Sequence, residues 1–122
     1  MKHISAIIAL CLALMFVAAP ARAQHSASLS WTASPDAAAN PSLGYNIYRL
    51  SGACPASGTA GFTKLNATPI STTTYTDASV GLGSFCYYVT ATLNGAESVP
   101  SNTASAVILP GAPTLLKFTS AT

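Results

Sequence analysis

The sequence predicts an all-β protein built as a sandwich or a barrel. Residues 84–94 alternate apolar and polar side chains with a period of two, which is typical of a half-buried strand. This stretch ends in Asn94-Gly95, a strong signal for a tight turn. Several other short β-prone stretches are separated by turn signals about every 8 to 12 residues, and no helical periodicity or internal repeat follows residue 23.

Residues 1–23 have the features of a secretory signal peptide. A short basic start precedes an apolar run at 4–17, and Ala21-Arg22-Ala23 offers the small-x-small pattern of a cleavage site. The apolar run is too short for a typical membrane span, which is the alternative interpretation. Cys11 follows Leu10 and is therefore a poor lipoprotein site. We expect cleavage before Gln24, a domain at 24–109, a C-terminal strand or tail at 110–122, and a secreted product without a membrane span.

The residues after the predicted cleavage site carry no net charge before the termini. Three basic residues balance three acidic ones: Arg49, Lys64, Lys117, Asp36, Asp77 and Glu97. No basic patch exists for phosphate contacts, so a nucleic-acid partner is not expected. A surface with so little charge has little self-repulsion and favours association.

Six strands are expected besides 84–94, counting the C-terminal one. The first covers 26–33 and a loop at 34–43 follows it; the next strands lie at 44–50, 62–66, 72–77, 98–109 and 115–118. Residues 51–61 are rich in Gly, Ser and Ala and form a loop. Pro100 places the 98–109 strand at a sheet edge. Alternation predicts a core of Leu29, Trp31, Tyr45, Ile47, Tyr87, Val89 and Ala91.

Two cysteines, Cys54 and Cys86, follow the predicted cleavage site. In a secreted domain of this size an even pair indicates a disulfide. Two free buried thiols are the alternative.

The segments HSASLSWTAS, GYNIYRL, FTKLN, TTYTDASV and CYYVTATLNGAESVPSN occur in this order. Together they resemble a fibronectin type III domain over residues 25–109. The resemblance implies an immunoglobulin-like Greek-key sandwich with strands A-B-E in one sheet and C′-C-F-G in the other. It makes Trp31 and Tyr45 core residues and Tyr87 a tyrosine corner, whose hydroxyl ties down the loop before its strand. These residues serve folding and do not identify a ligand.

The resemblance also accounts for the disulfide. Cys54 follows the end of strand C, and Cys86 lies where strand F begins beside it, with its side chain on the same outward face as Tyr88. Closing the loop between them should contribute roughly 3–4 kcal/mol in the chain-entropy model. The bridge is not a general feature of the family.

The chain departs from the family pattern at both ends. Almost nothing precedes strand B, so strand A is missing from the front. Residues 110–118, PGAPTLLKF, resemble the proline-rich lead and strand A of a following module. Folded back within the same chain, this segment would run opposite to the direction of strand A. Donated to a neighbouring copy, it would run in the native direction. Leu116 and Phe118 would fill the vacant groove, with Leu115 on the other face.

No catalytic or metal centre is predicted, and no cofactor is expected. His25 is the only histidine after the predicted cleavage site, and it lies at the chain end, so no Ser-His-Asp set can be assembled. The three acidic residues are interpreted as scattered in loops, and Gly81-x-Gly83 as a turn. The glycosylation triplet at Asn66 carries no functional weight.

Tyr48 and Tyr88 are expected to face outward on adjacent strands, as an aromatic contact surface or as an ordinary cross-strand pair. The functional prediction is a non-enzymatic secreted adhesive module, in one form a filament subunit assembled head-to-tail through the C-terminal strand. The alternative is a carbohydrate-associated or spacer module. The expected partner of the protein is a second copy of itself, another extracellular protein or a polysaccharide.

Overall fold

The computed structural model describes residues 25–111 and 114–118. Every regular element in these residues is a strand, which confirms the all-β prediction. The predicted signal peptide lies outside the described residues. The strands are β1 (Ala27–Ser30), β2 (Gly44–Ser51), β3 (Thr63–Lys64), β4 (Thr74–Asp77), β5 (Gly83–Leu93), β6 (Ala96–Glu97), β7 (Ala104–Ile108) and β8 (Thr114–Lys117).

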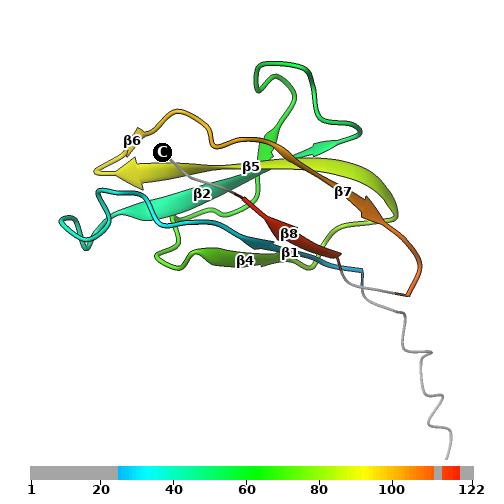
Figure 1. Cartoon of the computed structure of the whole chain (residues 1–122), viewed down its shortest axis with the longest axis horizontal. Coiled ribbons are helices and arrows are strands. Elements are labelled where there is room, and N and C mark those ends of the chain that lie inside the picture. The colour runs from blue at the N-terminus through cyan, green and yellow to red at the C-terminus, as the bar shows by residue number, and fades with distance from the viewer. Residues whose placement is uncertain (1–24, 112–113, 119–122) are drawn as a thin grey trace, which may run out of the picture.

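The strands form two sheets (Figure 1). One has the order β4-β1-β8, and the other has the order β3-β2-β5-β6 with β7 also paired to β5. All pairs are antiparallel except β1 with β8, which run parallel. Buried apolar side chains from both sheets form one cluster, so the two sheets share a core.

The strand predicted at 84–94 is the central β5. It pairs with β2 along eight residues, from Gly44 opposite Thr92 to Ser51 opposite Phe85, and with β7 on its other side. Asn94 and Gly95 both have positive φ values, 51° and 81°, and join β5 to β6 in the predicted tight turn.

The predicted core residues are all buried, and they lie with further side chains from β5, β7 and the C-terminal segment in one cluster. Trp31 packs edge-on against Tyr45 with ring centroids 5.4 Å apart. The backbone N–H of Ser34 donates to the Tyr45 hydroxyl at 2.8 Å, so this buried phenol also secures the start of the loop after β1.

The prediction that β5 is half-buried is wrong, because its middle is buried on both faces. The residues expected to face solvent, Cys86, Tyr88, Thr90 and Thr92, are at most 6% exposed. The loop after β2 lies over this face through the Cys54–Cys86 bridge and Phe62, and Glu97 bonds to Thr90. Alternation along a strand identifies two faces but does not show that a distant loop covers one of them.

The strand predicted at 98–109 is regular only from Ala104 to Ile108. Pro100 has no N–H, so a continuous ladder through this residue is blocked. Ser98 and Ser101 replace it with side chains: their hydroxyls accept from the backbone N–H groups of Ala91 and Val89, respectively. Their own N–H groups donate back to the carbonyls of the same two residues. The edge of β5 is therefore satisfied without a regular strand.

Candidate functional site

The C-terminal strand β8 completes the three-stranded sheet. It pairs with β1 in register, from Ala27 opposite Thr114 to Ser30 opposite Lys117. The backbone N–H of Phe118 continues the ladder by donating to the Ser30 carbonyl at 2.8 Å. Leu116 and Phe118 are buried in the core, whereas Lys117 is exposed. Leu115 lies within β8, but its side chain is outside the described part of the structure.

The direction of β8 is the direction expected for folding within the same chain. β7 ends, the chain crosses to the other sheet, and β8 then runs alongside β1 from the same end of the molecule (Figure 1). In the fibronectin type III pattern that the sequence resembles, strand A would instead lie antiparallel to its neighbour, strand B. The strand thus occupies the position predicted to be vacant, with the reverse polarity. Donation to a neighbouring copy stays a prediction.

The predicted aromatic pair is a stacked cross-strand pair and does not form an open platform. The Tyr48 and Tyr88 rings are 4.6 Å apart and nearly parallel, at 11°. Phe62 packs edge-on against Tyr88 at 4.8 Å, so Tyr88 is only 6% exposed. This burial corrects the expectation that Tyr88 faces solvent. Only Tyr48 of this pair is partly exposed.

On the same sheet face, Glu97 is the centre of a hydrogen-bond cluster that the sequence did not reveal. One of its oxygens, Oε1, accepts hydrogen bonds from Asn46 Nδ2, Tyr48 Oη and Thr90 Oγ1 at 2.6, 2.6 and 2.9 Å. The bonds from Tyr48 and Asn46 hold the pKa of Glu97 below its usual value. Burial, together with the bond to Glu97, raises the pKa of Tyr48 to about 12. The cluster has the character of a satisfied structural network.

Asn66, the residue of the glycosylation triplet, is fully engaged inside the fold. Its Oδ1 accepts from the Ile47 N–H at 2.8 Å, and its Nδ2 donates to the Tyr45 carbonyl at 2.9 Å. The same Nδ2 also lies within bonding distance of Asn46 Oδ1 and the Thr68 carbonyl. The amide therefore replaces a strand residue at the edge of β2, and it is buried in the folded protein.

Asp77 and Arg49 form an ion pair between the two sheets. Arg49 Nη1 lies 2.7 Å from Asp77 Oδ2, and Asp77 is only 1% exposed. The Tyr87 hydroxyl donates to the same oxygen at 2.9 Å, and Ser79 donates to Oδ1 through both its N–H and its hydroxyl. The Tyr87 hydroxyl is thus bound to the carboxylate of Asp77, the last residue of β4, after which the loop before β5 begins. The interpretation of Asp77 and Glu97 as loop residues is wrong, since they lie in β4 and β6.

Burial and hydrogen bonding act in opposite directions on Asp77. Burial favours the neutral acid, but the bonds from Arg49, Tyr87 and Ser79 outweigh it, and the pKa of Asp77 lies below its ordinary value. Burial, and then the bond to Asp77, raise the pKa of Tyr87 above its ordinary value. The network is therefore most stable with Asp77 charged and Tyr87 neutral.

These shifts predict how stability depends on pH. Because the folded pKa of Asp77 is below the unfolded value of about 3.9, its contribution is fully present above that pH and is lost as the pH falls toward the folded pKa. We expect the urea midpoint to drop steeply below about pH 4. The Asp77→Asn variant should show a shallower drop over the same range. An identical profile for both proteins would contradict the assignment.

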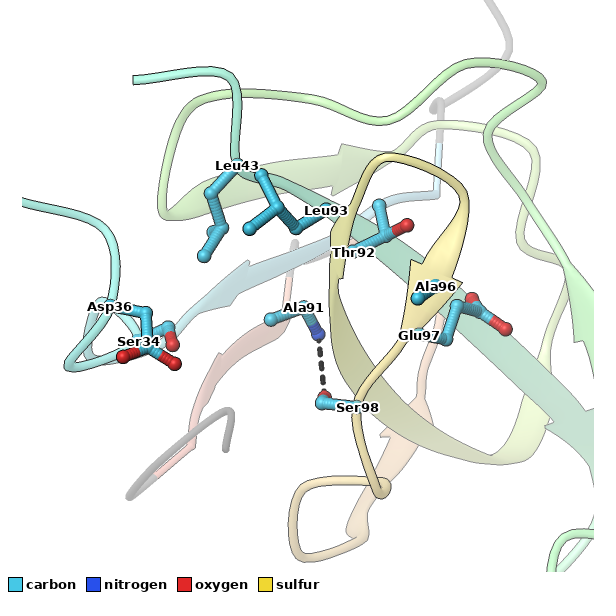
Figure 2. Close-up of a pocket in the computed structure, with 9 residues that line it drawn as sticks. All are labelled: Ser34, Asp36, Leu43, Ala91, Thr92, Leu93, Ala96, Glu97 and Ser98. Atoms are coloured by element: carbon cyan, nitrogen blue, oxygen red, sulfur yellow. Dashed lines mark hydrogen bonds between the residues drawn. The ribbon is translucent and has the colours of Figure 1, made fainter. Parts of the chain in front are cut away.

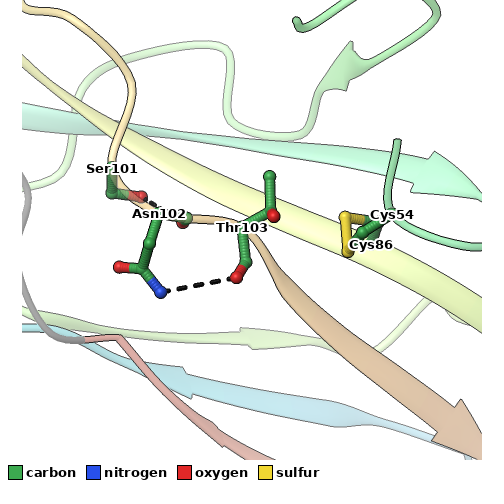
Figure 3. Close-up of a disulfide and its surroundings, with 5 residues drawn as sticks. All are labelled: Cys54, Cys86, Ser101, Asn102 and Thr103. Carbon is green, nitrogen blue, oxygen red and sulfur yellow. Dashed lines mark hydrogen bonds between the residues drawn. A yellow bond between two sulfur atoms is a disulfide. The ribbon is translucent and has the colours of Figure 1, made fainter. Parts of the chain in front are cut away.

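The predicted disulfide is present. Cys54 and Cys86 are joined with Cα atoms 5.0 Å apart, and Figure 3 shows the bridge lying on β5 beside the connection at Ser101–Thr103. Cys86 is opposite Leu50 in the ladder, near the end of β2. The bridge therefore holds the loop after β2 over the outer face of β5, the face on which the Cys86 side chain was expected.

A pocket of about 240 Å³ opens at one end of the sandwich (Figure 2). It lies between the loop after β1 and the hairpin of β5 and β6. Leu43, Ala91, Leu93 and Ala96 supply its apolar walls, and Ser34, Asp36, Thr92, Glu97 and Ser98 supply the polar ones. Asp36 lies on the side of the loop after β1, whereas the Glu97 carboxylate points away from the opening (Figure 2).

Comparison with protein-family models and with curated proteins found no match to this sequence. The geometry alone must therefore support a function.

The described residues contain no group of three or more His, Cys, Asp or Glu side chains that could hold a metal ion. Among the same residues, no helix is long and apolar enough to cross a membrane.

Proposed function

We propose that the protein is a secreted, non-enzymatic module of the fibronectin type III kind that acts as a structural or adhesive subunit. Its copies assemble head-to-tail when β8 of one copy pairs with β1 of the next. The observation that carries this proposal is the position of β8: a strand near the C-terminal end supplies two buried side chains, Leu116 and Phe118, to an edge beside β1.

The sheet order supports the choice of family. The order β4-β1-β8 corresponds to strands E-B-A, and β2, β3, β5 and β7 correspond to C, C′, F and G. The disulfide and the predicted signal peptide both support a secreted location. The covered Tyr88 ring gives the alternative, a carbohydrate-associated module, no stacking surface of its own.

The side-chain pattern of β8 permits exchange between copies. Leu116 and Phe118 are two residues apart, so they point to one face in either strand direction. In the same chain β8 pairs in parallel, which is the slightly less stable arrangement, whereas a donated strand would pair antiparallel. A head-to-tail contact of this kind propagates unless the rotation closes a ring.

Size-exclusion chromatography of residues 24–122 across a range of concentrations tests this proposal. We expect oligomers at high concentration, because a copy whose β8 leaves its own β1 offers one strand and one open edge to its neighbours. Without residues 110–122 the protein should stay monomeric, and a synthetic 110–122 peptide should bind it and raise its melting temperature.

Lys117→Ala provides the matched control, because this β8 side chain is exposed and should not alter assembly. A full-length protein that stays monomeric at all concentrations would overturn the proposal. So would proteolytic trimming to residue 110 without loss of stability.

A further inference from the structure

The two ends of the sandwich differ in their surface chemistry. The end where β7 finishes and β5 begins, here the donor pole, carries Leu82 and Leu109, which are 55% and 63% exposed. Gly83 and Ile108 form the last cross-strand pair of β5 and β7 at this pole. Leu82 directly precedes Gly83, and Leu109 directly follows Ile108. The opposite end, where β5 turns into β6 (Figure 1), is here the acceptor pole, and it carries the 240 Å³ pocket (Figure 2).

The pocket suits an apolar side chain of leucine size. A cavity of about 150 Å³ lined by apolar residues can already hold a benzene molecule. Leu43, Leu93 and two alanines line this pocket, and Asp36 gives its rim a negative charge. Its opening to solvent allows a side chain to enter without rearrangement of the core.

The path of a donated β8 brings Leu109 to this pocket. A strand that pairs antiparallel to β1 must begin beside the end of β1, at the acceptor pole of the receiving copy. Ser34, which lines the pocket, follows Ser30 by only four positions along the chain. The five-residue step from Leu109 to Thr114 can span roughly 16–18 Å when extended. That reach exceeds the spacing of about 10 Å between packed sheets.

We propose that the pocket at the acceptor pole receives Leu109 of a neighbouring copy, with Leu82 packing at its rim. The inference rests on the proposed head-to-tail assembly and names the contact that accompanies strand donation. An exposed apolar group that fits a pocket elsewhere on the same molecule makes a heterologous contact, which extends into a filament. The exposed leucines at one pole and the pocket at the other thus serve the same interface.

The negative rim allows a charge test at one position. Leu109→Glu places a carboxylate near Asp36, whereas Leu109→Lys places a cation there. We expect Leu109→Glu to raise the concentration needed for assembly about tenfold or more, and Leu109→Lys to raise it much less. Both are read by sedimentation velocity at several salt concentrations, and the difference should shrink as salt screens the charges.

Thr63→Glu is the control, because Thr63 is exposed in β3, pairs with Arg49 of β2 and does not line the pocket. Thermal unfolding of each variant at low concentration checks that the fold is kept. Equal assembly by wild type, Leu109→Glu and Leu109→Lys would overturn this contact and leave strand donation standing. A wild-type protein that never assembles would overturn both. An equal loss in the Glu and Lys variants would show that Leu109 contacts another surface, which also overturns the pocket assignment.

Discussion

Replacing Phe118 with alanine is expected to lower the free energy of unfolding by about 3–5 kcal/mol. The ring is 2% exposed and lies in the shared core of the two sheets, so its loss leaves a large cavity. It also lies directly after β8, where its own N–H closes the ladder with Ser30. Urea denaturation of the monomer at low concentration measures the effect.

Lys117→Ala is the control for this change as well, since it shortens an exposed neighbour and should alter stability by no more than about 0.5 kcal/mol. Leu116→Ala, with a smaller buried side chain, should cost about 2–5 kcal/mol. A Phe118→Ala protein as stable as wild type would mean that the C-terminal strand contributes little to the fold. The proposed exchange of this strand would then lose its energetic basis.

Local patterns in the sequence were sufficient to predict most of the strands and most of the core. Leu29 and Trp31 alternate with serine and threonine, as do Tyr45 and Ile47 with polar residues, and each alternation reflects one buried face. The turn at Asn94-Gly95 was also predicted from a local signal, because only a few residue types accept its positive φ values. The tail was predicted as a strand from its resemblance to the lead and strand A of a following module, and β8 is a strand at this position.

The features that could not be predicted depend on partners distant in the chain. Asp77 is held by Arg49 and Tyr87, which reach it from the other sheet, and no local pattern shows that these three side chains meet. Tyr88 is covered by Phe62, which belongs to a loop whose path the disulfide determines. Periodicity shows which residues share a face, whereas coverage of that face and ion pairing across sheets arise only in the folded structure.

Replacing Arg49 with methionine is expected to lower the free energy of unfolding by about 3 kcal/mol at neutral pH, because it leaves the buried carboxylate of Asp77 without its counter-ion. The effect lies toward the lower end of the range for broken buried pairs, since Tyr87 and Ser79 still donate to Asp77. Part of the loss also comes from packing, because the Arg49 guanidinium lies over the Phe85 ring at 5.7 Å. Urea denaturation gives the magnitude.

The pH dependence of the Arg49→Met effect separates the charge from the packing. Once the cation is gone, the pKa of Asp77 should rise, so the carboxyl becomes neutral at a higher pH than in wild type. The cost of the substitution should therefore shrink as the pH falls toward about 3. In the double variant Arg49→Met, Asp77→Asn, no buried charge remains, and the total loss should be smaller than the sum of the single losses. Strict additivity together with a cost independent of pH would show that Arg49 acts through packing alone.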